Sequence, residues 1–186
     1  MILVTHNQHK FLEYEEIFLR SKIELEWYNY EYPELQSDNL KEIVEFSLKH
    51  VSRILNRPFF LEDTGLFIDS LGGFPGPYSS YVQEKIGNMG ILRLLEGISN
   101  RNARFISLIG YFDGKNFYYF DGTLEGSISY SIRGKNGFGY DPIFIPEKYD
   151  KTLAEMSIQE KNSISHRRRA LDKLLGYIKN SMESIK

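Results

Sequence analysis

A polar hexapeptide, Thr5 to Lys10, follows a short apolar stretch at the N-terminus, in a pattern that can bind phosphate. Free backbone amides and a lysine at the start of a helix attract anions. The segment is not a Walker A loop, because it lacks the glycine spacing and the Lys-Ser/Thr pair. A polar turn in which Thr5 or Asn7 caps the helix is the competing interpretation. His6 and His9 lie three residues apart, and without a third ligand nearby they indicate surface residues rather than a metal site.

Adjacent carboxylates, Glu62 and Asp63, precede Thr64 at the expected end of a short strand. Carboxylate oxygens are ligands that Mg²⁺ prefers, and Glu34 in an earlier polar segment is a further candidate. An ion held there could bridge phosphate oxygens and acidify a water molecule. A turn in which Asp63 accepts a hydrogen bond from its own backbone is an equal alternative.

The segment 137–142 places Phe138, Tyr140 and Asp141 on a loop between glycines. An aromatic ring there can stack on a nucleobase, and a carboxylate can accept hydrogen bonds from base N–H groups. The segment is not a dinucleotide fingerprint, because Pro142 takes the position of the last glycine.

Basic residues, Lys161, His166 and Arg167, lie before or in the first turn of the last expected helix. Cations usually favour the opposite end of a helix. Their position therefore indicates a bound anion, and a solvated basic face that includes Arg168 and Arg169 is the alternative.

Strand and helix patterns alternate in the first half of the chain and become a strand meander in the second. The expected strands are 2–5, 23–28, 59–62 (ending at Asp63), 104–112, 116–121 and 126–132. The expected helices are 8–20, a helix capped by Ser37 or Asp38 and ended by Arg57-Pro58, one around 91–95, and a last one from about 162. This order predicts an α/β fold with a mixed sheet and helices on both faces. A second lobe within about 66–132 could leave a cleft between the lobes.

The composition limits the possible classes of protein. A chain of 186 residues suits one domain, and the absence of cysteine excludes a disulfide framework, a cysteine metal site and a cysteine nucleophile. A net charge of −2 argues against a general nucleic-acid binder. The N-terminal apolar run is too short for a signal peptide, and no stretch is long enough for a membrane span. We therefore expect a cytoplasmic protein.

Five motifs in this order resemble the Ham1-type inosine triphosphate pyrophosphatases, also called XTP/dITP pyrophosphatases. The motifs are LEDTGL (61–66), LGGFPGPY (71–78), GFGYDPIF (137–144), AEMSIQEKN (154–162) and SHRRRAL (165–171). The opening THNQHK (5–10) also matches the family's Thr/Ser-x-Asn-x-x-Lys start. The resemblance extends from Ile2 to about Tyr177.

The resemblance implies a Mg²⁺-dependent enzyme that forms a homodimer and has neither nucleic acid nor a membrane as a partner. Such enzymes hydrolyse noncanonical purine nucleoside triphosphates (ITP, dITP, XTP) to the monophosphate and pyrophosphate, and so clear deaminated purines from the nucleotide pool. The implied fold is two-lobed on a long twisted mixed sheet, with the substrate in the cleft. It forms one domain over residues 1–186.

The resemblance also implies the roles of single residues. Asp63 would be the catalytic carboxylate and, with Glu34, would bind Mg²⁺. Phe138 would stack on the base. The other residues expected to bind substrate are Thr5, His6, Asn7, Gln8, His9, Lys10, Thr64, Gly139, Tyr140, Asp141, Lys161, His166 and Arg167. Glu62 stands where many bacterial members have Asp, so its role is left open.

The chain departs from the family pattern at Ser47, where many members have a phosphate-binding lysine. Lys49 lies about 200° further around the helix and does not replace it. Two other hypotheses remain open: a Maf-type pyrophosphatase acting on other nucleotides, and a non-enzymatic nucleotide- or RNA-binding module that uses the SHRRR segment.

Overall fold

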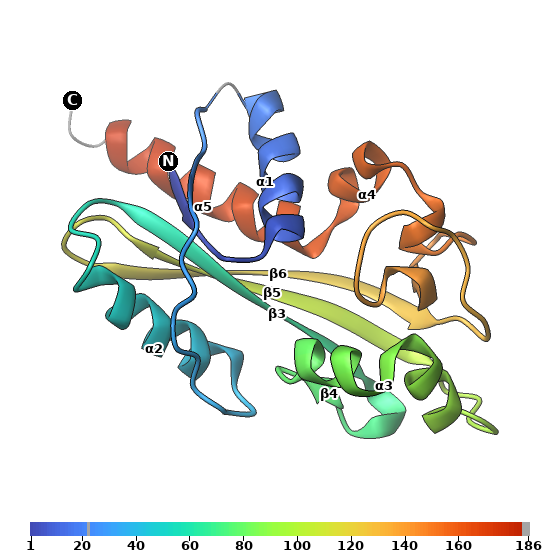
Figure 1. Ribbon diagram of the computed structural model, residues 1–186. Helices are drawn as coiled ribbons and strands as arrows, with labels where there is room; N and C mark the ends of the chain where they lie inside the picture. The colour runs from blue at the N-terminus through green and yellow to red at the C-terminus, as the bar shows by residue number, and fades with distance from the viewer. Residues whose placement is uncertain (22, 184–186) are drawn as a thin grey trace.

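Three long antiparallel strands form the centre of the protein in the computed structural model, which describes residues 1–21 and 23–183 (Figure 1). The elements are β1 (Ile2–Val4), α1 (Gln8–Ser21), β2 (Glu26–Tyr28), α2 (Leu40–Ser52), β3 (Phe59–Ile68), β4 (Pro75–Gly76), α3 (Ser79–Leu94), β5 (Asn102–Phe112), β6 (Phe117–Ile128), β7 (Phe144–Pro146), α4 (Ile158–Ile164) and α5 (His166–Glu183). No helix in this described part of the chain combines the length and the apolar character needed to cross a membrane.

The seven strands form one mixed sheet in the order β2-β1-β3-β5-β6-β7, with β4 paired to β3. Strand β1 is parallel to both β2 and β3, whereas β3, β5, β6 and β7 are antiparallel to their neighbours. The mixed sheet with helices on both faces confirms the predicted fold class.

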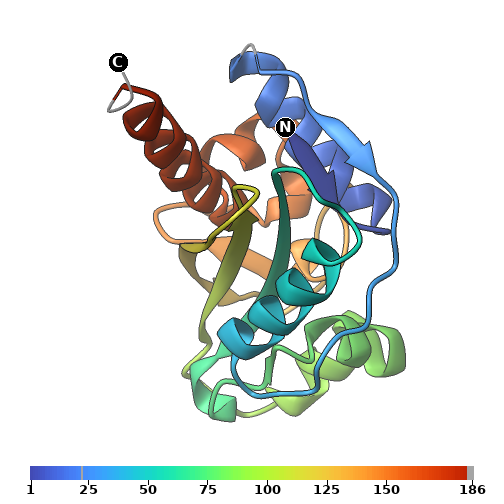
Figure 2. The same ribbon diagram turned by 90° about the vertical axis from the view of Figure 1, so that its left-hand side faces the viewer.

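Alternate residues of β3 face two different hydrophobic cores, as the two-residue repeat of a strand requires. Phe60 packs with residues of α1 and α5 on one face. Phe59 and Leu61 pack with α2 on the other face. Figure 1 shows α1 and α5 on one side of the strands and α2 on the other, and Figure 2 shows the same separation from the side.

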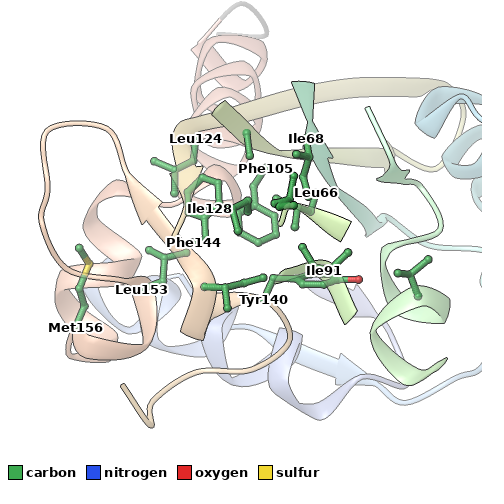
Figure 3. Close-up of a cluster of buried hydrophobic side chains, with 14 residues drawn as sticks. Leu66, Ile68, Ile91, Phe105, Leu124, Ile128, Tyr140, Phe144, Leu153 and Met156 are labelled. Atoms are coloured by element: carbon green, nitrogen blue, oxygen red, sulfur yellow. The ribbon is translucent and has the colours of Figure 1, made fainter. Parts of the chain in front are cut away.

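A third core lies where β3, β5 and β6 extend beyond the first two cores (Figure 3). Leu66 and Phe105 from the strands pack there with Ile91 of α3 and with Tyr140 and Phe144. This core therefore fixes the segment that starts at Tyr140 against the sheet.

The sequence prediction for β3 was wrong, because the strand does not end at Asp63 but runs from Phe59 to Ile68. Each of its ten residues pairs with β5, and Leu66 and Ile68 continue the alternation into the third core. Glu62 and Asp63 therefore lie in the middle of a strand. The expected strand 126–132 is likewise the end of β6, which stops at Ile128.

The last helix was also predicted with the wrong start, because the chain forms two helices there. Ser157 and Glu160 form a capping box that begins α4. Ser165 is then extended (φ −65°, ψ 156°), and its hydroxyl oxygen accepts a hydrogen bond from the Arg168 amide at 3.1 Å. Lys161 thus lies inside α4, while His166 and Arg167 begin α5.

Other element boundaries differ from the prediction for local reasons. Asn39, not Ser37 or Asp38, caps α2 by accepting a hydrogen bond from the Lys41 amide at 2.9 Å. The helix ends at Ser52, before Arg57. Strand β2 covers only residues 26–28, and α3 begins twelve residues before the expected helix around 91–95.

Helix α5 packs so closely on β6 that residue 122 must be glycine. A Cβ atom on Gly122 would lie 2.1 Å from the carbonyl oxygen of His166 and 2.4 Å from the amide nitrogen of Ala170. We predict that Gly122→Ala lowers the free energy of unfolding by about 1–3 kcal/mol or more, because backbone atoms have to move apart. Urea denaturation measures this effect.

Gly176→Ala is the matched control on α5. No atom lies within 4 Å of the added Cβ, and alanine favours a helix over glycine by up to about 1 kcal/mol. We expect this variant to be as stable as the wild type or more stable. Equal unfolding midpoints for Gly122→Ala and the wild type would contradict the close packing of α5 on β6.

Candidate active site

A cavity of about 410 Å³ brings together the segments that the sequence singled out. Every predicted site residue lines it except Gln8, which is exposed and lines neither of the two cavities described, and Lys161, which lines a neighbouring cavity of about 170 Å³. The lining residues that the sequence prediction missed are Tyr32, Pro77, Ser79, Ser80, Gln83 and Phe105. Pro77 lies in the LGGFPGPY motif, which carries no chemical signal of its own, and the other five residues lie in none of the quoted motifs, so only the fold reveals their position.

The turn after β1 is built by its own side chains. The Thr5 hydroxyl oxygen accepts a hydrogen bond from the Asn7 amide at 3.1 Å, and the Asn7 side chain accepts one from the Lys10 amide at 3.1 Å. The carbonyl oxygen of Thr5 accepts a hydrogen bond from the Trp27 indole at 2.8 Å. The capping interpretation is therefore correct for Asn7, and the same turn also places Thr5, Asn7 and Lys10 on the cavity wall.

Asp63 and Glu34 are the carboxylates that line the cavity near Lys10. The Asp63 side chain accepts a hydrogen bond from the Thr64 amide at 2.8 Å, and the Lys10 ammonium lies 3.8 Å from it. Burial raises the pKa of Asp63 to about 6, because the Glu34 and Glu62 charges act in the same direction and the Lys10 charge only partly opposes them. Asp63 therefore keeps its proton to a higher pH than an ordinary aspartate does.

Glu62, whose role the sequence left open, is buried and does not line the cavity. It accepts hydrogen bonds from the Ser107 hydroxyl at 2.8 Å and from Thr64. Burial raises its pKa, but the Lys10 and Arg167 charges outweigh burial and bring the pKa well below the usual value. Glu62 is thus an ionised carboxylate that holds Lys10 at 3.2 Å.

The loop around Phe138 is tied to its surroundings at three points. The Asp141 carboxylate accepts a hydrogen bond from the Phe138 amide at 2.8 Å. The Gln83 and Asn88 side chains each donate to the Gly139 carbonyl oxygen at 3.1 Å. The Tyr140 hydroxyl donates to the Ser79 carbonyl oxygen at 2.9 Å. Hydrogen bonds within the loop and to α3 therefore fix the backbone that carries Phe138.

Glu13 is a buried residue of the site region that the sequence prediction missed. Its carboxylate accepts hydrogen bonds from Lys161 and from Arg167, the latter at 2.8 Å. Lys161 also donates to Asp141. Glu13 lies four residues before Ile17 on the buried face of α1. A carboxylate in such a position needs a buried cationic partner. The helical spacing of Glu13 could therefore have predicted a buried ion pair from the sequence.

Lys161 and Arg167 are therefore engaged by carboxylates rather than free to face an anion. Both side chains are only 4% exposed, and Arg167 also lies 3.6 Å from Glu62. Burial lowers the pKa of Arg167, but Glu62 and Glu13 outweigh it and raise the pKa further above its usual value. The guanidinium stays charged, and its Nε has no hydrogen-bond partner among the described residues.

His166 is a buried neutral histidine at the cavity. Its ring stacks on Phe105 with centroids 4.8 Å apart. Burial, reinforced by the Arg167 charge, lowers its pKa well below the usual value. Neither ring nitrogen has a hydrogen-bond partner within residues 1–21 and 23–183. A neutral imidazole offers one donor and one acceptor, so His166 can recognise a polar ligand edge.

Helix α2 adds no cation to the cavity. Ser47, the position at which the sequence departs from the family, is buried and donates to the Pro33 carbonyl oxygen at 3.5 Å. Lys49 is paired with Glu45 instead. Within the part of the chain that the structure describes, no group of three or more His, Asp or Glu residues could hold a metal ion by itself.

Comparison with known proteins identifies relatives over almost the entire chain. A model of the Ham1 family matches residues 1–177. A protein of Methanopyrus kandleri named dITP/XTP pyrophosphatase is 48% identical over 183 residues, which cover 98% of this chain and 97% of that protein. One of the same name from Thermococcus kodakarensis is 45% identical over 183 residues, or 98% and 99% of the two chains.

Solved structures show the same fold. A HAM1 protein from Coxiella burnetii superposes with a TM-score of 0.81 at 29% identity, over 97% of this chain and 99% of that one. The Ham1 protein of Staphylococcus aureus superposes with a TM-score of 0.80 at 29% identity, over 97% and 100% of the two chains.

The raised pKa of Asp63 predicts a stability that falls as pH rises. The unfolded chain releases this proton near the ordinary pKa of 3.8, and the folded protein only near about 6. Folding is therefore penalised progressively across this window and remains so above it. We predict that Asp63→Asn raises the free energy of unfolding by on the order of 1–3 kcal/mol at neutral pH in the presence of a chelator.

Urea denaturation across this pH range tests the prediction, with Asp121→Asn as the control. Asp121 is exposed and ion-paired with Lys173, and that pairing lowers its pKa. We expect no gain in stability from Asp121→Asn. Below the ordinary pKa of 3.8 the advantage of Asp63→Asn should disappear. A gain that does not change with pH would contradict the assignment to the Asp63 carboxyl group.

Proposed function

Because the chain belongs to the Ham1 family, we propose that it hydrolyses noncanonical purine nucleoside triphosphates (ITP, dITP and XTP) to the monophosphate and pyrophosphate. Relatives of 44–48% identity that are named dITP/XTP pyrophosphatase support this substrate class. One observation supports it in the structure. A single cavity joins a carboxylate pair and a phosphate-binding turn to an aromatic ring and buried, unpartnered polar groups.

Mg²⁺ is the proposed cofactor, and Asp63 and Glu34 are the residues that would hold it. Both carboxylates line the cavity, and the pKa of Asp63 is raised first by burial and then by the Glu34 and Glu62 charges, which a bound cation would offset. Oxygen ligands from two carboxylates and substrate phosphates suit Mg²⁺, which is rarely enclosed by protein ligands alone. When bound, the ion supplies charge neutralisation and acidifies a water molecule.

The charge balance of the site supports this requirement for a cation. A nucleoside triphosphate carries about four negative charges at neutral pH. The cations near the cavity, Lys10, Lys161 and Arg167, already face Glu62, Glu13 and Asp141. These three cations therefore neutralise less of the substrate's negative charge than their number indicates. Lys10 and the turn at Thr5 would bind phosphate only with help from an added cation.

Asp63 is the proposed general base. A carboxylate with a pKa of about 6 is largely ionised at neutral pH and accepts a proton more readily than an ordinary aspartate. The Thr64 amide fixes one of its oxygens at 2.8 Å. Asp63 would orient the attacking water and take its proton, while pyrophosphate leaves from the substrate.

His166 and Arg167 are the proposed readers of the base. Hypoxanthine and xanthine present a 6-keto acceptor, whereas adenine presents a 6-amino donor. The His166 ring nitrogens and Arg167 Nε are buried and lack hydrogen-bond partners among the described residues, so an N–H donor there would bind the keto group and stay unpaired opposite adenine. Sites built in this way can discriminate between such substrates by a factor on the order of 10⁴.

That the protein is a homodimer and that it is located in the cytoplasm stay predictions.

We predict that the purified protein with Mg²⁺ releases pyrophosphate from ITP, dITP and XTP far faster than from ATP or dUTP. The assay compares these substrates and GTP and measures pyrophosphate separately from orthophosphate. Release of orthophosphate alone, or a preference for ATP or dUTP, would exclude the proposed function. Preference for dUTP would favour the Maf-type hypothesis, and absence of turnover would favour a binding module.

We predict that Asp63→Asn abolishes turnover, with a loss in kcat of at least ~10²-fold, because a general base of this kind contributes about 10²–10⁴. Asp121→Asn, which removes an equal charge from an exposed position in β6, should keep wild-type activity. Steady-state kinetics with dITP measures both variants. Near-normal turnover by Asp63→Asn would remove Asp63 from the catalytic role.

A further inference from the structure

Two aromatic rings from distant parts of the chain stack at the cavity. The His9 imidazole and the Phe138 phenyl ring have centroids 5.1 Å apart and planes inclined by 15°. His9 lies in the first turn of α1, and Phe138 lies in the loop before Tyr140. Both rings line the main cavity and also the smaller neighbouring one. They therefore stand at the boundary between the two hollows.

We propose that His9 is a second base-stacking residue, so that the nucleobase is held between the His9 imidazole and the Phe138 ring. This inference rests on the proposed function, since it assumes a nucleotide substrate. The resemblance gives His9 only as one of the residues that bind substrate, and the pattern of residues 5–10 indicates phosphate binding. The contact with Phe138 assigns its side chain to the other end of the nucleotide.

The near-parallel orientation of the two rings supports this role. A planar base between two walls needs each wall roughly parallel to it, with ring centroids about 4.5–7 Å from its own. The observed angle of 15° meets the first condition. The separation of 5.1 Å is that of two rings in contact, so one ring has to move when a base enters.

His9 is the ring that can move. Its side chain is exposed on the first turn of α1, so a rotamer change exposes no core. The backbone at Phe138 is held by the hydrogen bond that its amide donates to the Asp141 carboxylate, and by those that Gln83 and Asn88 donate to the Gly139 carbonyl oxygen. Lys161 and Arg167 also lie 5.0 and 5.3 Å from the Phe138 ring centroid.

The position of His9 along the chain fits a substrate that spans the cavity. The next residue, Lys10, lies 3.8 Å from Asp63, where the phosphates are proposed to bind. His9 itself reaches the ring proposed to bind the base. One turn of α1 would thus contact both ends of the nucleotide.

His9→Ala tests the proposal by steady-state kinetics with dITP. We expect KM to rise at least about fivefold with a smaller change in kcat, as loss of a base-stacking partner predicts. His9→Phe should restore a KM close to that of the wild type, because a phenyl ring stacks as well. His50→Ala is the matched control, since His50 stacks on Tyr30 and lines neither cavity.

Inorganic tripolyphosphate separates base binding from phosphate binding. Its inhibition constant against dITP should be the same in His9→Ala and the wild type, because it has no base. If the wild type is active and His9→Ala has the same KM for dITP, the proposal is overturned. A lower KM also overturns it, because His9 would then block the base. An equal rise in KM and in the tripolyphosphate constant would assign His9 to the phosphates. A wild type that releases no pyrophosphate from dITP overturns the proposed function itself.

Discussion

The pairing of buried charges is the constraint on which the rest of the site depends. Charged groups removed from water are stable only when they are paired and hydrogen-bonded. Glu13 on α1 meets this condition by accepting hydrogen bonds from Lys161 of α4 and Arg167 of α5. Lys161 also donates to Asp141, which follows the loop that carries Phe138. These contacts fix three helices and a loop in one arrangement, so the geometry of the cavity follows from charge pairing as much as from hydrophobic packing.

The same pairing leaves the Asp63 carboxylate only partly compensated by a cation. Glu62 retains Lys10 at 3.2 Å and stays ionised, so Asp63 receives only partial help from the same lysine at 3.8 Å. Burial raises the pKa of Asp63 to about 6, the Glu34 and Glu62 charges act in the same direction, and Lys10 opposes them only in part. Proteins commonly accept such a local loss of stability at functional sites. The proposed cation and triphosphate would together restore the charge balance around Asp63.

The segments that line the cavity were singled out from the sequence because their signals are local. The turn at Thr5 and the loop at Phe138 were located from residue types at strand and helix ends, and both line the cavity. Features that depend on distant partners were missed. The full length of β3 depends on pairing with β5. The role of Glu13 depends on Lys161 and Arg167, some 150 residues away. Local patterns contain no information on such partners. The family was identified instead from the order of several motifs along the chain.

The two ends of the cavity require different surroundings, and the third core explains how one chain supplies both. Phosphates and a metal ion tolerate water, so the turn that contains the exposed His6 can be open to solvent. Discrimination at the base requires unpaired donors to be costly, and they are costly only where water is excluded. His166 stacks on Phe105, which also packs against Phe144 of the third core. The extension of the long strands beyond the first two cores therefore buries the side of the cavity at which we propose that a keto group is distinguished from an amino group.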